Sequence, residues 1–295
     1  MTEFAAGDGL GRLSLNVWTT KGWSLREAVD GCVRAGVPGI GLWRDKVAEV
    51  GVDVAARLVR GSGLTVTSLC RGGFFTGDAA QRAAAAADNR RAVAEAAALG
   101  TDVLVLVVGG LPAGSTDLAG ARSQVAEGLA DLAPHAVEHG VRLAIEPLHP
   151  MFCADRAVIS TLGQALDLAE QIEPDGAAAP AVGVCLDSYH VWWDPQLLAQ
   201  IGRAGPRILA FQVSDFLVPI PPDALLGRGH LGDGVIDIPA LTRAVLAAGY
   251  DGLIEVEIFN QQVWDAPGEQ TLRTIIDRHR RYLAGLTGTG HPAPC

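Results

Sequence analysis

Three acidic side chains stand at the ends of apolar segments that read as buried strands. Glu146 closes "LAIE" and is followed by Pro147, Asp187 closes "VGVCLD", and Glu257 lies near the end of "LIEVEIF". A strand in a hydrophobic core does not normally end this way, because burial penalises an ionised carboxylate. Each acid alone can be explained as the N-cap of a following helix, but three in matching positions indicate a site.

The chemistry that such acids favour is metal binding. Carboxylates that converge without a cation repel one another and resist ionising. A divalent cation removes that conflict, and oxygen ligands suit Mn²⁺ or Mg²⁺, while a nearby histidine extends the choice to Co²⁺ or Zn²⁺. His190 follows Asp187 by three residues and could contact either the ion or, preferably, a substrate oxygen. A packed loop histidine is the alternative.

The elements that must position these residues alternate between short apolar segments and helical ones. Strands are predicted over residues 12–18, 39–43, 64–70, 102–108, 141–147, 181–187, 207–215 and 252–259. Helices are predicted between them, for example over 24–36, with Ser24 as N-cap, and over 78–100, ended by Gly100. Strict alternation without hairpin signals predicts a parallel sheet.

Eight such units in one chain of 295 residues predict an α/β fold, a (β/α)₈ TIM barrel in a single domain. The alternative is an open doubly wound sheet, but no GxGxxG follows the first strand. We expect the barrel to span residues 11–286, with a flexible N-terminal tail over 1–10 and a flexible C-terminal tail over 287–295.

A barrel places its active site at the carboxyl ends of its strands, which explains acids in those positions. The last four predicted strands all end in oxygen-bearing side chains: Glu146, Asp187, Gln212, Asp215, Glu255 and Glu257. We therefore expect them to meet at one end of the barrel.

Composition narrows the class of partner. The net charge of −10 disfavours a sequence-independent nucleic-acid binder, although "RHRR" at 278–281 is locally basic. No apolar stretch is long enough to cross a membrane, and the N-terminus lacks the pattern of a signal peptide. The five cysteines are scattered and form no CxxC, as in reduced cytoplasmic proteins. We expect a cytoplasmic protein with a small-molecule partner and no nucleic acid or membrane.

Five segments together resemble the sugar phosphate isomerase/epimerase family, the xylose-isomerase-like TIM barrels. They are "AIEP", "LDSYH", "QVSD", "RGHLGDGVID" and "YDGLIEVEIFN". The resemblance covers nearly the whole chain and depends on the order and spacing of these motifs. It implies a sugar-like substrate and a divalent ion held by Glu, Asp, His and Glu from the last four strands. Family members are commonly dimers or tetramers, so a homodimer or homotetramer is expected.

Carried across, the resemblance assigns the metal ligands Glu146, Asp187 and Glu257, with Glu255 as a deeper carboxylate paired in the core. The third ligand departs from the pattern, because Gln212 stands where relatives carry histidine. Glutamine is also neutral and offers a carbonyl oxygen, which favours Mn²⁺ or Mg²⁺ over Zn²⁺. Loss of the metal is the alternative.

The resemblance also implies substrate contacts. His190 matches a histidine that hydrogen-bonds substrate, and Arg228 and His230 match a loop over the mouth. Outside the family set, Arg71 after the third strand could bind a carboxylate or phosphate, and His149 could act as an acid or base. Aromatic residues near strand ends, including Trp18 and Trp192, could stack on a sugar or exclude water, or simply pack the rim.

The implied mechanism is proton transfer beside a carbonyl group. A metal ion would stabilise the enediolate, and Glu146 and Glu257 would remove and return the proton, giving an isomerase or epimerase. A lyase that dehydrates its substrate on the same barrel is the nearest alternative. A degenerate barrel that binds without turnover is the other, and Gln212 keeps it open.

Overall fold

Eight parallel strands close into a barrel in the computed structural model, which describes residues 9–173 and 179–287. The order around the barrel is β1-β10-β7-β6-β5-β4-β3-β2. The barrel strands are β1 Leu13–Asn16, β2 Gly39–Trp43, β3 Thr65–Gly73, β4 Val103–Val107, β5 Arg142–Ile145, β6 Val182–Asp187, β7 Ile208–Val213 and β10 Ile254–Val256. The predicted (β/α)₈ barrel is confirmed, and the open doubly wound sheet is excluded.

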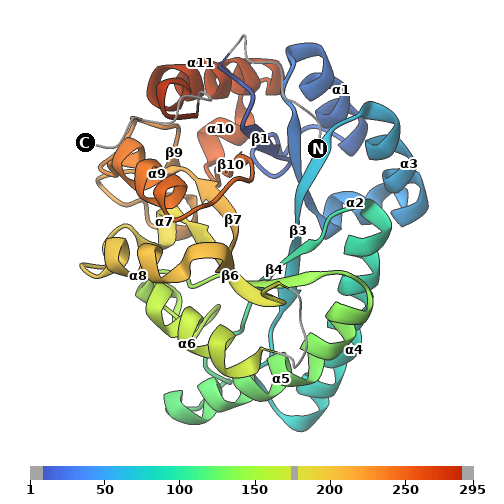
Figure 1. Cartoon of the computed structure of the whole chain (residues 1–295), viewed down its shortest axis with the longest axis vertical. Helices are drawn as coiled ribbons and strands as arrows, with labels where there is room; N and C mark the ends of the chain where they lie inside the picture. The colour runs from blue at the N-terminus through green and yellow to red at the C-terminus, as the bar shows by residue number, and fades with distance from the viewer. Residues whose placement is uncertain (1–8, 174–178, 288–295) are drawn as a thin grey trace.

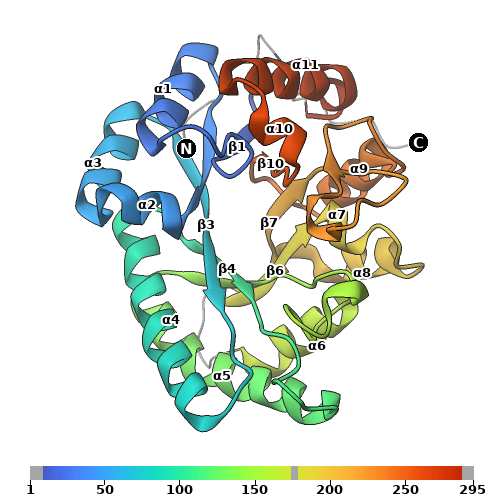
Figure 2. The same cartoon turned by 180° about the vertical axis from the view of Figure 1, so that it is seen from behind.

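Helices form an outer ring around the strands, as Figures 1 and 2 show from opposite sides. The helices of the described residues, including the short α7 and α10 in the loops after β6 and β10, are α1 Leu25–Ala35, α2 Arg44–Val50, α3 Val52–Ser62, α4 Ala79–Leu99, α5 Leu118–Glu138, α6 Leu162–Ile172, α7 Ser188–Val191, α8 Leu197–Ala204, α9 Ile238–Ala247, α10 Gln261–Asp265 and α11 Gly268–Thr287. Short 3₁₀ turns are η1 Pro150–Phe152, η2 Gly205–Arg207 and η3 Ala224–Leu226. Helix α11 lies beside α1 and closes the ring, with an ion pair between Arg34 and Glu269.

The predicted tails, 1–10 and 287–295, fall outside the described residues except at residues 9, 10 and 287. Leu10 is buried in the core. Within the described ranges, no helix combines the length and apolar character needed to cross a bilayer.

Local sequence explains where the helices start and stop. Ser24 accepts a hydrogen bond from the Glu27 N–H and Glu27 returns one to Ser24, which is a capping box at the start of α1. Gly100 ends α4 with φ of 82°, a left-handed conformation that glycine adopts without steric cost. Both predicted caps are confirmed. Strand β4, "VLVLV", is buried along its whole length because the ring covers its outer face.

The barrel interior is polar at its centre, and glycine on β2 makes room for it. A Cβ atom on Gly41 would lie 2.3 Å from the Glu255 carboxyl carbon. Glu255 is 1 % exposed and accepts hydrogen bonds from four neutral side chains: Asn16, Thr67, Ser68 and Gln212. The prediction of a deeper, core-paired carboxylate at this position is confirmed.

A small antiparallel pair, β8 Asp215–Phe216 and β9 Arg228–Gly229, follows β7 at the same end of the barrel. The Asp215 carboxylate accepts the backbone N–H groups of Gly232 and Ile236. Asp215 therefore holds the loop after β9, and this fixes the backbone that carries Arg228.

Candidate active site

Three acidic side chains converge at the carboxyl ends of the last strands. We call this end of the barrel the mouth. Glu146 follows β5, Asp187 ends β6 and Glu257 follows β10. The Arg228 Nη1 atom lies 2.6 Å from Asp187 Oδ2 and 3.3 Å from Glu257 Oε2. His190 Nε2 lies 3.8 Å from Glu146 Oε1 and 3.9 Å from Asp187 Oδ2. The three acids, Arg228 and His190 thus form one buried cluster.

The cluster borders a cavity of about 220 Å³, which we call the mouth cavity. Its lining is Trp18, Trp43, Asp45, Arg71, Val107, Glu146, Leu148, Arg156, His190, Leu225, Arg228, Glu257 and Phe259. Small-molecule sites commonly enclose about 300–1,000 Å³, so this cavity suits a small substrate.

Burial without enough positive charge raises the pKa of all three acids. Burial, then the charge of Asp187, raises the pKa of Glu146 to about 8. Burial also raises the pKa of Asp187, against the opposing effect of Arg228, and holds that of Glu257 well above its usual range. For His190, burial and then the Arg228 charge lower the pKa well below its ordinary value, so the imidazole is neutral.

Arg228 is the cation in contact with these acids, although it comes from a loop strand. Its guanidinium is 2 % exposed, and Nη2 lies 3.1 Å from His190 Nε2. Because arginine only donates, this contact is a hydrogen bond in the His190 tautomer with an unprotonated Nε2 atom. Burial lowers the pKa of Arg228, but the charges of Asp187, Glu257 and Glu146 outweigh it and raise that pKa overall.

The donor set fits a divalent cation. Ligand atoms of Glu146, Asp187 and His190 lie within 4.8 Å of one another, all three residues being buried. Carboxylates with a neutral imidazole suit Mn²⁺, Co²⁺ or Zn²⁺. A second group in the described part of the chain, His135, Glu138 and His139, lies at the end of α5, away from the mouth.

Gln212, expected as the third ligand, turns its side chain toward the barrel interior. Its amide nitrogen donates to Glu255 Oε1 at 2.9 Å, and its carbonyl oxygen accepts from the Cys185 thiol at 3.3 Å. Burial raises the pKa of that thiol and keeps it protonated. The structure thus groups His190 with Glu146 and Asp187, whereas the Gln212 side chain contacts Glu255 and Cys185, and ligation by Gln212 stays a prediction.

The two acids expected to move protons have different surroundings. The Oε1 atom of Glu257 accepts from Asn16 Nδ2 at 2.9 Å and from Trp43 Nε1 at 3.3 Å. Glu146 receives no hydrogen bond to its carboxylate within the described residues. Both carboxylates face the mouth cavity from strands three places apart around the barrel.

Four of the residues predicted to bind substrate line the mouth cavity: Trp18, Arg71, His190 and Arg228. The Trp18 ring stacks on Trp43, with ring centroids 5.1 Å apart. Together with Phe259, these rings form an aromatic wall beside Glu257.

The other three predicted substrate contacts lie elsewhere. His149 and Trp192 pack their rings against Phe216, which belongs to β8. His230 follows the end of β9, where the chain turns, and it lines a separate cavity of about 400 Å³ with Asp233 and Asn260 among others.

Sequence reasoning missed seven residues of the site: Asn16, Asp45, Val107, Leu148, Arg156, Leu225 and Phe259. Asn16 ends the first strand, so the signal that found Glu146 also marks this position. Arg156 lies in the irregular segment after β5, where no periodicity points inward.

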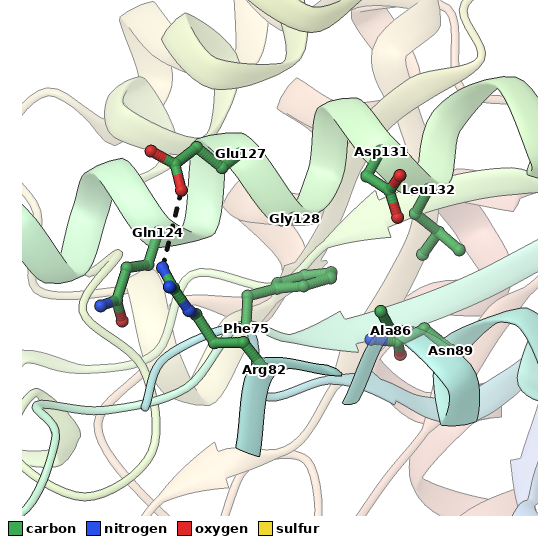
Figure 3. Close-up of a pocket in the computed structure, with 9 residues that line it drawn as sticks. All are labelled: Phe75, Arg82, Ala86, Asn89, Gln124, Glu127, Gly128, Asp131 and Leu132. Carbon is green, nitrogen blue, oxygen red and sulfur yellow. Dashed lines mark ion pairs between the residues drawn. The ribbon is translucent and has the colours of Figure 1, made fainter. Parts of the chain in front are cut away.

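A further cavity of about 210 Å³ lies outside the barrel between α4 and α5, with Phe75 and Gly128 in its lining (Figure 3). Its rim arginine, Arg82, pairs with Glu127 at 3.7 Å. With its charges paired in this way, the cavity offers none of the chemistry of the mouth.

Comparison with known proteins gives several relatives. The chain is 32 % identical over 189 residues to a 3-dehydroshikimate dehydratase of Pseudomonas putida, a match that covers 60 % of this chain and 27 % of that protein. It is 26 % identical over 152 residues to an inosose isomerase of Bacillus licheniformis, covering 50 % of this chain and 51 % of that protein. The match thus spans about half the isomerase and less than a third of the dehydratase.

Solved structures share the fold. A protein of Sinorhizobium meliloti 1021 is 50 % identical, with a TM-score of 0.88, over 92 % of this chain and 98 % of that one. The IOLI protein, solved with a bound zinc atom, is 20 % identical with a TM-score of 0.77, over 92 % of this chain and 99 % of that one. A D-psicose 3-epimerase is 17 % identical with a TM-score of 0.72, over 94 % and 99 %.

The model of one protein family, described as the xylose isomerase-like TIM barrel, matches residues 29–282. That match includes Glu146, Asp187, His190, Arg228 and Glu257, and agrees with the resemblance seen in the sequence. The chain belongs to the xylose isomerase-like TIM barrel family.

Proposed function

We propose that this protein is a metal-dependent enzyme that removes a proton from the carbon beside a carbonyl group of a small hydroxylated substrate. Return of the proton to the same or the neighbouring carbon makes it an epimerase or isomerase. The observation that carries the proposal is the pairing of two buried acids, Glu146 and Glu257, across one small cavity that also holds a group fit for a divalent cation.

The ion would be held by Glu146, Asp187 and His190, with Glu257 beside them and Gln212 at the position where relatives carry a ligating histidine. We expect Mn²⁺ or Mg²⁺, and the imidazole makes Co²⁺ or Zn²⁺ compatible. When bound, such an ion supplies Lewis-acid polarisation of a substrate carbonyl.

The residues of the chain divide the remaining tasks. Glu146 lacks a hydrogen-bond donor among the described residues, so its carboxylate is free to accept a proton from substrate. Glu257 is held in place by Asn16 and Trp43 and is suited to return one. The neutral His190 and the cationic Arg228 can bind substrate oxygens, and the aromatic wall excludes water from the reacting carbon.

Dehydration is the second candidate, and the Arg71 side chain in the mouth cavity favours it. The names of the relatives include both an inosose isomerase and a 3-dehydroshikimate dehydratase. The substrate of the dehydratase carries a carboxylate, whereas an inosose is neutral. The mouth cavity contains an arginine whose Nη1 atom has no hydrogen-bond partner in the described structure, Arg71.

The mass of the product distinguishes an isomerase or epimerase from a dehydratase. The purified protein, supplied with Mn²⁺, is incubated with keto-inositols, ketoses and a hydroxylated cyclic keto acid, and products are measured by mass spectrometry. Isomers and epimers keep the substrate mass and are identified by chromatography, whereas dehydration removes one water. A barrel that binds without turnover gives no product from any of them, and that result would overturn the proposal.

A further inference from the structure

We propose that Arg71, with Arg156 beside it, binds a carboxylate group of the substrate, so that the natural substrate is a hydroxylated keto acid. This inference rests on the proposed function, since it takes the mouth cavity as the place where substrate binds.

Arg71 is a half-buried cation with one shielded nitrogen, Nη1, that lacks an acceptor in the described structure. An arginine side chain presents five N–H groups, and a buried polar group left unpaired costs free energy. A ligand that supplies acceptor oxygens would remove that cost.

The surroundings of Arg71 hold its charge in the cavity without neutralising it. Its guanidinium carbon lies 4.3 Å from the centre of the Phe74 ring and 5.9 Å from that of Trp43. Burial is the largest cause that lowers the pKa of Arg71, and the like charge of Arg156 lowers it further. Asp45 and Glu146 are near enough to oppose that shift, but neither forms an ion pair with Arg71.

Arg156 adds a second positive group to the same part of the lining. Its nearest acid is the adjacent Asp155, with Nε and Oδ2 3.7 Å apart, which is too long for a hydrogen bond. Two arginines facing one cavity repel each other, and an anion between them relieves that repulsion. Planar guanidinium groups match the two oxygens of a carboxylate.

The backbone holds both arginines in fixed positions. Gly73 follows Arg71 by two residues and is held by the buried Asn89 side chain. That side chain accepts the Gly73 N–H at 2.7 Å and donates to the Gly73 carbonyl at 2.8 Å. The Arg156 carbonyl accepts the Gly109 N–H at 2.9 Å, which ties its loop to the end of β4. The subsite is therefore preorganised and need not be assembled by the ligand.

A carboxylate suits the cavity better than a phosphate does. The cavity is small, and its lining already includes the acids Asp45, Glu146 and Glu257. A singly charged planar group adds less repulsion toward those acids than a phosphate dianion. With its carboxylate at Arg71, the substrate extends its hydroxyl and carbonyl groups toward Glu146 and Glu257.

Binding measurements test this inference without turnover. Shikimate and quinate are hydroxylated six-membered ring carboxylates, and myo-inositol is a neutral ring polyol of similar size. Their affinities are measured by calorimetry for the wild type, for Arg71→Met and for Arg57→Met, with and without added Mn²⁺. Arg57 is exposed on α3, so its replacement is a control for the loss of one positive charge.

We expect at least one carboxylate to bind the wild type and the Arg57→Met control alike, and Arg71→Met to weaken it roughly 10- to 100-fold. Arg156→Met should weaken it less, and myo-inositol should respond to neither change. Equal affinity of the carboxylates for wild type and Arg71→Met, no binding of either carboxylate, or Arg71-dependent binding of inorganic phosphate alone would each overturn the inference.

Thermal unfolding of the ligand-free proteins separates binding from a structural role. Since Arg71 Nη1 lacks an acceptor, Arg71→Met should melt at the wild-type temperature or above it. A marked loss of stability with unchanged carboxylate affinity would assign Arg71 to structure instead. Carboxylate binding that depends on Arg71 in a protein without turnover would refute the proposed function and leave this subsite intact.

Discussion

The interior layer around Glu255 and the mouth around Glu146 contain the same kind of residue in opposite surroundings. Both acids are buried, Glu255 at 1 % exposure and Glu146 at 6 %. Glu255 accepts hydrogen bonds from Asn16, Gln212 and two hydroxyl groups, all neutral donors. Glu146 has acidic neighbours and no hydrogen-bond donor among the described residues. The difference shows which buried acid is structurally complete and which one still needs a cation or a substrate.

Asn16 connects the two regions. Its Nδ2 atom donates to Glu255 Oε1 at 2.7 Å and to Glu257 Oε1 at 2.9 Å. Through Asn16, the hydrogen-bonded layer around Glu255 therefore orients the Glu257 carboxylate, as supporting side chains commonly do for catalytic groups.

The largest expected effect is a loss of turnover on substitution of the acids at the mouth. Glu146→Gln and Glu257→Gln should each lower turnover at least ~100-fold, because each removes a group that accepts or returns a proton. The fold should be kept, since the Glu146 carboxylate accepts no hydrogen bond from the described residues and a glutamine at position 257 still offers an oxygen to Asn16 and Trp43. Steady-state kinetics and circular dichroism measure the two properties separately. Wild-type turnover in either variant would count against the assignment.

A substitution in the interior layer, Glu255→Gln, should lower the stability of the fold. In Glu255→Gln, one carboxylate oxygen becomes an NH₂ group that faces side chains which themselves donate. Losing charge-assisted hydrogen bonds from two donors should lower the free energy of unfolding by about 3–5 kcal/mol. Urea denaturation measures this loss. If Glu255→Gln were as stable as the wild type, the contrast between the two regions would fail.

His279 is a buried polar side chain that lacks a hydrogen-bond partner in the described structure and yet belongs to no site. It is 0 % exposed, and neither ring nitrogen has a hydrogen-bond partner in the described structure. Burial, and then the charge of Arg280, lower its pKa to about 4. Being unpaired is therefore not enough to make a site, and a bordering cavity with convergent chemistry is also required.

The pH dependence that follows from His279 has a definite sign. Unfolded histidine titrates near 6.5, so between pH 6.5 and 4 the unfolded state binds more protons and stability falls as the pH falls. This group should account for a loss of about 3 kcal/mol by pH 4, from a shift of roughly 2.5 pKa units. His279→Leu should flatten the stability curve over that window in chemical denaturation. An unchanged slope would contradict it.

The smallest expected effect is steric. Gly41→Ala places a Cβ atom 2.4 Å from Glu255 Oε1, so the interior layer must shift. Overpacking of this kind costs about 1–3 kcal/mol. Gly61→Ala is the matched control, because a Cβ there meets nothing within 4 Å. Equal stability of the two variants would show that the interior adapts more easily than its hydrogen bonds suggest.

The sequence is sufficient to predict the barrel and the acids, because both are local signals. The spacing of apolar residues distinguishes the strands from the helices, and an acid at the end of an apolar segment can be read directly from the sequence. Glu146, Asp187 and Glu257 can therefore be recognised from the amino-acid sequence alone, as can the deeper position of Glu255.

Side-chain direction and loop packing are not visible in the sequence. Gln212 ends a strand as Asp187 does, but it turns inward because Glu255 and Cys185 offer it partners there. Arg156 reaches the cavity from an irregular segment, whereas His230, two residues from Arg228, faces a different cavity. These outcomes depend on tertiary contacts that periodicity does not encode.

We propose that the mouth, unlike the interior, is completed by a divalent cation. The direct test is the metal content of protein purified without chelators, followed by calorimetric titration of chelator-treated protein with Mn²⁺. We expect about one bound ion per chain in the wild type, and strongly weakened binding in Glu146→Gln and Asp187→Asn. No bound metal in the wild type, even after Mn²⁺ is added, would contradict it.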